Sequence, residues 1–197
     1  MDPVSTSRPE TAPPADRRSR PPQGFAAVLP LLVGSTVGAV GGSTFVVANA
    51  SALGPPWSWV ALGVGCVLAL GWVAATFLRR HAPLEMPPRR HAFVVYAVSV
   101  VAMLVLIRLA MMALGALGAE HLRPAALAVA VGLHFLPFAW AFPSASRLFG
   151  VLGGVVAALG AAGLTLGLLG TPAAGAAAAV LAGLTMLALI TLHNLRH

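Results

Sequence analysis

Of the polar side chains inside the long apolar runs, two stand out as the residues best able to do chemistry. Arg108 stands between the apolar stretches 103–107 and 109–114, and His134 lies ten residues after Pro124. A guanidinium binds anions and carbonyl oxygens, and an imidazole can donate a proton, accept one or bind a metal. Because polar groups are costly within an apolar membrane helix, each of them marks a candidate functional site.

Pro137 follows His134 by three residues and adds a backbone acceptor at the same depth. Proline has no N–H, and its ring crowds the carbonyl four residues earlier, which is that of Leu133. A backbone polar group inside a membrane must find a partner. We therefore expect a polar site within the membrane that includes Arg108, His134, Leu133 and Pro137.

Three arrangements stay open for Arg108. It can reach inward to the carbonyl of Leu133 or to His134, because a short loop connects the third and fourth apolar runs and we expect them to be neighbours in the fold. It can pair with Glu120 as its counter-ion. It can also extend its guanidinium to the lipid interface and do nothing more. His134 itself fits a hydrogen-bonded packing position as well as a ligand or a proton carrier.

No motif indicates catalysis or a bound cofactor. The sequence has no H-E-x-x-H, G-x-S-x-G or P-loop pattern, and no Asp or Glu lies in an apolar run. His193 and His197 are four residues apart, a spacing that can chelate a metal, but no acid or cysteine accompanies them. We expect no catalytic residue, no metal and no cofactor. The missing carboxylates also disfavour transport driven by protons or sodium.

The composition is typical of a membrane protein. Hydrophobic residues make up 58% of the chain and charged residues 9%, whereas ordinary globular chains have about 45–50% and about 25%. Six apolar runs are each near the roughly 20 residues that cross a bilayer. They predict an all-α integral membrane bundle with transmembrane helices at 25–48, 57–78, 92–114, 124–142, 148–169 and 173–193.

The arginines predict the orientation of this bundle. All twelve basic residues are arginines, and ten of them lie before the first run, in every second loop or at the C-terminal end. Because basic residues in short loops stay cytoplasmic, both termini are expected inside, an N-in/C-in arrangement. Arg108 and Arg123 are the two exceptions. Orientation thus explains the net charge of +7, and we expect a lipid bilayer, not nucleic acid, as the partner.

The N-terminal segment divides the chain. Residues 1–23 are rich in proline and arginine and predict a disordered cytoplasmic tail, so that 24–197 form the six-helix domain. Arg17 and Arg18 before the first run, and Ala48-Asn49-Ala50 at its end, also fit a cleaved export signal. The run is longer than the roughly 7–15 apolar residues of such a signal, which favours an uncleaved span. Absence of lysine with abundant Ala, Gly, Arg and Pro indicates a GC-rich bacterium, and hence a bacterial cytoplasmic (inner) membrane.

Glycines at spacings of four predict close helix contacts. Helical periodicity places such residues on one face, where a second helix can approach closely. We expect the first, fifth and sixth helices to form a tight inner cluster. Interior packing is the favoured use of these faces, and a homo-oligomer is the alternative. The residues concerned are Gly34, Gly38, Gly42, Gly150, Gly154, Gly163 and Gly167.

The stretch Gly132-Leu133-His134-Phe135-Leu136-Pro137-Phe138-Ala139 resembles a G-x-H-F-x-P-x-A core of small, uncharacterised bacterial multi-pass membrane proteins. The similarity covers one span. It implies that His134 and Pro137 are the positions to test, and it implies no substrate or activity.

Two functions follow from these features. The first is a small-solute transporter, permease or channel subunit with a site at Arg108 and His134, for which an anion or a neutral polar solute is suited. The alternative is a non-catalytic scaffold or interaction protein that packs through its glycine-rich faces. A membrane enzyme has the least support. A cavity joining Arg108 to His134 would favour the first, and a solid core with Arg108 turned outward would favour the second.

Overall fold

A computed structural model describes residues 25–78 and 88–196, with side chains from Gly34 onward within these ranges. The predicted tail at 1–23 lies outside the described residues, as do Arg79, Arg80 and His197.

Six helices account for most of the described chain, and each is long and apolar enough to cross a membrane. They confirm the prediction of an all-α bundle with six spans, and their bounds differ from the predicted ones by at most three residues. The long helices are α1 (Phe25–Asn49), α2 (Trp57–Leu78), α3 (Ala92–Ala116), α4 (Arg123–Ala141), α5 (Ser146–Leu168) and α6 (Ala174–Arg196). Three short 3₁₀ turns join them, η2 (Ala50–Leu53), η3 (Glu120–Leu122) and η4 (Pro143–Ala145).

Glycine ends α3 and sets up the sharp turn into α4. Gly118 has a φ of 64°, which is a left-handed backbone conformation. Glycine adopts it without a steric clash because it has no Cβ. The N–H of Ala119 donates to the carbonyl of Leu114 at 2.8 Å, and that of Gly118 donates to Gly115 at 3.1 Å. These two bonds are the Schellman arrangement that satisfies the last carbonyls of a helix. The same pair of bonds ends α5 at Gly170.

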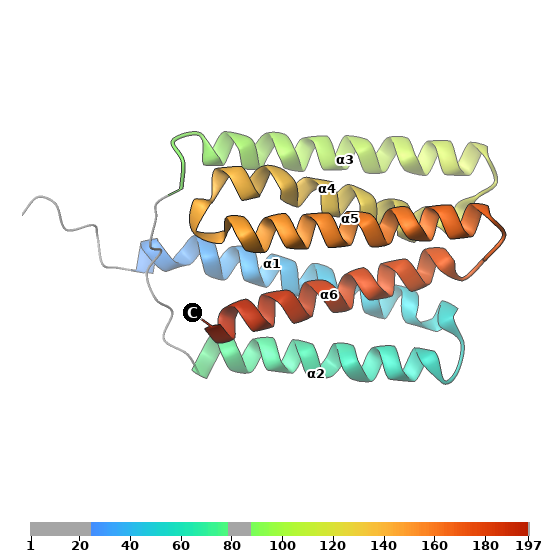
Figure 1. Cartoon of the computed structure of the whole chain (residues 1–197), viewed down its shortest axis with the longest axis horizontal. Helices are drawn as coiled ribbons and strands as arrows, with labels where there is room; N and C mark the ends of the chain where they lie inside the picture. Colours follow the sequence, from blue (N-terminus) through green and yellow to red (C-terminus); the bar gives the residue numbers. More distant parts are fainter. Residues whose placement is uncertain (1–24, 79–87, 197) are drawn as a thin grey trace, which may run out of the picture.

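The helices run side by side along the long axis of the molecule, with α3 at one edge and α2 at the opposite edge (Figure 1). The last helix, α6, is the most buried of the six and contacts α1, α2, α4 and α5. The hydrophobic core between α6 and its neighbours includes four almost fully buried side chains, those of Leu152, Val156, Met186 and Leu187. The helix α3 packs chiefly on α4, and this position leaves most of its surface outside the bundle.

The most extensive contact between two helices is that of α4 with α5, and α4 was not part of the predicted inner cluster. Glycine explains the close approach. A Cβ placed on Gly160 would lie 2.6 Å from the backbone nitrogen of Val129 and 2.7 Å from the carbonyl oxygen of Ala125. A Cβ on Gly132 would collide with the backbone of Ala157. These two positions therefore exclude any side chain.

The predicted glycine faces divide into two groups. Gly38 and Gly42 of α1 lie against α6, and Gly163 and Gly167 of α5 lie against Ala178 and Leu122. These four contact neighbours within this chain. Three others depart from the prediction. A Cβ on Gly34 or Gly154 would meet no described atom within 4 Å, and one on Gly150 would meet only the Cβ of Ala139 at 3.9 Å.

Candidate functional site

The candidate site lies where α3 and α4 meet, near the middle of the membrane span. His134 comes eleven residues after Arg123 and seven before Ala141, the two ends of α4. At 1.5 Å per residue it is about 17 Å from one end of the helix and about 10 Å from the other. Ser99 is seven residues after Ala92, so it lies about 10 Å along α3 from the same side of the bundle.

Ser99 and His134 form the hydrogen-bonded centre of this site. The Oγ of Ser99 lies 2.8 Å from Nδ1 of His134 and 2.9 Å from the carbonyl oxygen of His134. A serine hydroxyl carries one proton, and a carbonyl can only accept. The arrangement that satisfies both contacts has Ser99 donating to the carbonyl and Nδ1–H donating to Ser99. We infer that Nδ1 carries the ring proton.

This assignment makes the second ring nitrogen of His134 an acceptor. In a neutral imidazole with a protonated Nδ1, Nε2 has a free lone pair. Within the described part of the chain Nε2 has no hydrogen-bond partner, and it is not among the fully buried side-chain atoms that lack one. The site therefore contains one acceptor that is not fully buried and has no partner among the described residues.

A groove of about 370 Å³ surrounds this pair and is named the α3/α4 groove. Its polar wall consists of Ser99 and His134, and the other lining residues are apolar or proline. Val98 and Leu133, two of its wall residues, are exposed on the surface of the bundle, so the groove opens toward lipid. The full lining is Val94, Val95, Val98, Ser99, Ala102, Met103, Leu106, Ala130, Leu133, His134 and Pro137.

Aromatic rings hold the imidazole from one side. The ring of Phe138 lies edge-on to His134 with centroids 4.6 Å apart, and it stacks on Tyr96 of α3 at 5.4 Å. Phe149 of α5 contacts the same ring at 5.5 Å. Edge-to-face and stacked rings at these distances attract each other beyond simple burial. Phe138 thus ties α3, α4 and α5 together beside the site.

Arg89 fixes the nearby end of α4. Its backbone N–H donates to the carbonyl of Ala141 at 3.1 Å, and its guanidinium lies 4.6 Å from the centre of the Trp140 ring. A positive charge at a helix C-terminus is favourable because the last carbonyls carry partial negative charge. This arginine therefore has a capping role in addition to the orientation role that the sequence suggested.

The structure separates Arg108 from the rest of the predicted site. Arg108 comes nine residues after Ser99, and nine steps of 100° place a side chain on the opposite side of a helix. Arg108 is exposed and does not line the α3/α4 groove. His134, Leu133 and Pro137 do share that groove. The backbone carbonyl that accepts a side-chain hydrogen bond here is that of His134. The sequence had suggested the carbonyl of Leu133, one residue earlier.

Glu120 pairs with Arg123, whereas the sequence suggested Arg108 as its partner. Its Oε1 accepts a hydrogen bond of 2.7 Å from Nη2 of Arg123, three residues further on. Residues three apart in a helical turn are neighbours, so this local pair forms in preference to one with Arg108. Both side chains remain substantially exposed.

No family model, curated protein or solved structure matches this chain.

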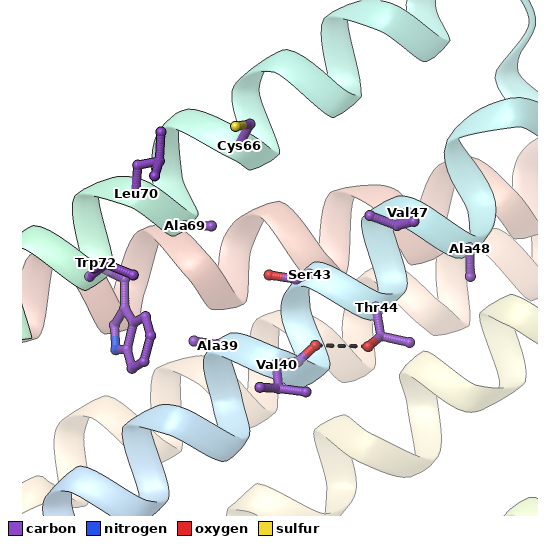
Figure 2. A pocket seen from close by; sticks show the side chains of 11 residues that line it. Ala39, Val40, Ser43, Thr44, Val47, Ala48, Cys66, Ala69, Leu70 and Trp72 are labelled. Carbon is purple, nitrogen blue, oxygen red and sulfur yellow. Dashed lines mark hydrogen bonds between the residues drawn. The ribbon is translucent and has the colours of Figure 1, made fainter.

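A second groove, of about 560 Å³, lies between α1 and α2 and is named the α1/α2 groove. Figure 2 shows Ser43 of α1 and Cys66 of α2 on its facing walls, with the Trp72 ring between the two helices. The hydroxyl of Thr44 donates to the carbonyl of Val40 at 2.9 Å, a bond within its own helix. The groove is almost wholly apolar, which fits a surface covered by lipid chains.

Cys66 is the only thiol and allows a direct test of this lipid contact. It is exposed on the groove wall nine residues after Trp57, and so about 13 Å along α2. We expect a lipophilic maleimide to modify it in intact membranes and a charged, membrane-impermeant thiosulfonate to leave it unmodified. Mass spectrometry of the protein measures both reactions, with Cys66→Ser as the blank. Equal modification by the charged reagent would indicate water in the groove.

Proposed function

We propose that this multi-pass membrane protein is a small-solute permease or transporter component whose α3/α4 groove binds an amphiphilic molecule. The observation that carries the proposal is the accessible Nε2 of His134 beside apolar walls at mid-depth. An acceptor at such a place pairs with a hydroxyl or an N–H on an otherwise apolar ligand. Because Arg108 lies on the other side of α3, an anion is not the favoured solute of this site.

The chemistry of the groove favours a lipophilic alcohol, phenol or hydroquinone. Moving a hydroxyl group into hydrocarbon without a partner costs about 4–8 kcal/mol relative to water, so a ligand already in the bilayer gains from an acceptor. A ligand that lacks the donor leaves Nε2 unpaired. Loss of one such bond changes binding by about 1–3 kcal/mol, which corresponds to a change of roughly 5- to 150-fold in Kd.

A pair of matched probes tests this proposal. We expect 4-nonylphenol to raise the unfolding temperature of the purified protein in nanodiscs, and its methyl ether to raise it much less. Both compounds partition into the bilayer, and only the phenol has a donor for Nε2. The difference should vanish in His134→Phe, which keeps an aromatic ring beside Phe138. Equal stabilisation by the two compounds in the wild-type protein would contradict the proposal.

A scaffold or interaction protein is the alternative function, and the uncovered outward side of α3 is the observation that favours it. The glycine faces that were candidates for docking are used inside the bundle at Gly38, Gly42, Gly163 and Gly167. A docking surface must therefore lie elsewhere, and the outward side of α3, which carries Arg108, is the one that most needs a partner. A homo-oligomer through the open positions Gly34 and Gly154 stays a secondary proposal.

The proposed orientation is N-in/C-in in a bacterial inner membrane. One end of the described helices carries four arginines, Arg89, Arg90, Arg147 and Arg196. Basic residues in short loops are enriched on the cytoplasmic side. Support also comes from the opposite end, where the only described arginine is Arg123 and Glu120 neutralises it.

Two serine positions at opposite ends of the bundle test the orientation. In the Cys66→Ser background we expect Ser51→Cys in η2 to react with an impermeant maleimide in whole cells. Ser144→Cys in η4 should react only after the membrane is opened. Gel shift of the labelled protein measures both. The reverse pattern would invert the proposed topology.

A further inference from the structure

The outward side of α3 presents a charge in the middle of an apolar surface. Around Arg108 lie Leu104, Val105, Leu109 and Met112, each with more than half of its side chain exposed. These five residues are named the α3 outer face. Because α3 packs chiefly on α4, the face has no covering helix within the described chain. A guanidinium on such a surface is costly unless it is paired, and a carboxylate is the partner that also neutralises its charge.

The position of Arg108 favours a partner at depth over a lipid headgroup. Arg108 is eight residues before Ala116 and sixteen after Ala92, or about 12 Å and about 24 Å from the two ends of α3. Side chains on an α-helix lean toward its N-terminus. The guanidinium therefore leaves the backbone in the direction of the distant interface. To reach the nearer interface, the side chain of Arg108 would have to point toward the C-terminus of α3, against this preferred direction.

Within the described residues, a second copy of this chain offers no anion at that depth. The described helices α1 to α6 contain no Asp or Glu, and Glu120, the one acid that the structure describes, lies just before α4 and pairs with Arg123. The acids of the whole chain are Asp2, Glu10, Asp16, Glu85 and Glu120. A carboxylate inside the membrane opposite Arg108 has to come from another protein.

We propose that the α3 outer face docks a transmembrane helix of a different protein, whose intramembrane Asp or Glu pairs with Arg108. Planar guanidinium and carboxylate groups form two parallel hydrogen bonds, which gives the contact a defined register. The exposed leucines, valine and methionine supply apolar packing around the pair. This docking is independent of ligand binding in the α3/α4 groove, because the two surfaces lie on opposite sides of α3.

Designed helices provide the probe. Three dansyl-labelled oligoleucine peptides without tryptophan carry Glu, Gln or Leu eight residues from the peptide end that lies in the same leaflet as Ala116. Energy transfer from the tryptophans of the full chain measures their association in phosphatidylcholine vesicles. We expect the Glu peptide to bind at least about tenfold more tightly than the other two, which is about 1.4 kcal/mol. The preference should disappear in Arg108→Leu and persist in Arg147→Leu, which removes an exposed arginine at the end of α5.

The register of the probe separates docking from nonspecific charge attraction. Moving the glutamate to the peptide centre should reduce the preference, because the carboxylate no longer faces Arg108. Equal binding of the three peptides to the wild-type protein would overturn the proposal. A second overturning result is that Arg108→Leu leaves peptide binding unchanged and instead lowers affinity for phosphatidylglycerol, which would assign the guanidinium to a lipid phosphate. Unchanged unfolding temperature of Arg108→Leu shows that the variant is folded.

Discussion

Gly153→Leu will disrupt the contact between α4 and α5, whereas Gly154→Leu, one residue further along the same helix, will leave the protein folded. A Cβ on Gly153 would lie 2.8 Å from the carbonyl oxygen of Gly132 and 2.8 Å from Cδ2 of Leu136. The backbone oxygen cannot move without moving α4. At Gly154 the same Cβ meets no described atom within 4 Å.

The expected size of this effect is large for a single residue. Overpacking a filled contact costs about 1–3 kcal/mol for small additions, and leucine adds four carbons against backbone. We expect Gly153→Leu to lower the unfolding temperature sharply and to reduce the yield of monodisperse protein. The measurement is thermal unfolding followed by size-exclusion chromatography. Similar losses in both variants would show that α5 tolerates no leucine on any side, contrary to the structure.

The same variant should also damage the candidate site. Gly132 stands two residues before His134, so its contact with α5 sets the position of His134 along α4. We expect Gly153→Leu to lose the difference between 4-nonylphenol and its methyl ether, and Gly154→Leu to keep it.

Ser99→Val will destabilise the wild-type protein by about 1 kcal/mol, a value within the range measured for hydrogen bonds between membrane helices. Valine has a similar shape and removes both hydrogen bonds to His134. The Nδ1–H then has no partner at mid-depth. In a His134→Phe background the same replacement should cost less, because no ring N–H is left unpaired and only the bond from Ser99 to the backbone carbonyl of residue 134 is lost.

A double-mutant cycle measures this coupling by denaturant unfolding in detergent micelles. Thr44→Val is the matched control, since its hydroxyl bonds only to the carbonyl of Val40 in its own helix. It should cost less than Ser99→Val and show no coupling to His134→Phe. Strictly additive effects of Ser99→Val and His134→Phe would mean that the bond between Ser99 and the imidazole of His134 does not contribute to stability.

The fold was predictable because its signals are local. A run of about 20 apolar residues crosses a bilayer whatever its neighbours are, and turn residues such as Gly118 act within a few positions. The depth of His134 follows equally from counting residues along α4. Depth along a helix is what a single sequence reveals best in a membrane protein.

To predict which residues form the site, the angular position of each residue around its helix is required. Counting residues along the chain does not supply that position. Arg108 and His134 were grouped by depth and by the short loop, but Arg108 lies half a turn away from the face that meets α4. Ser99 was missed because one serine in an apolar run is a weak signal. Its distance of nine residues from Arg108 shows that both cannot face α4.

The glycine pattern failed in part for the same reason. Gly150 and Gly154 are four apart, like Gly163 and Gly167, and yet only the second pair faces a close neighbour. The contact face of α5 passes instead through Gly153 and Gly160. Which side of α5 faces a close neighbour depends on the helices that lie next to it. The packing of the whole bundle determines those neighbours.

The central place of α6 has a consequence for how the protein is made. Helices enter the membrane in chain order during synthesis, and α6 is the last of the six. Until it arrives, α1 and α2 on one side and α3 to α5 on the other lack the helix through which they chiefly meet. Before α6 is in place, each of these two groups has an uncovered face, and α6 covers both faces in the finished bundle. During that interval a chaperone or a partner helix has access to surfaces that the finished protein hides.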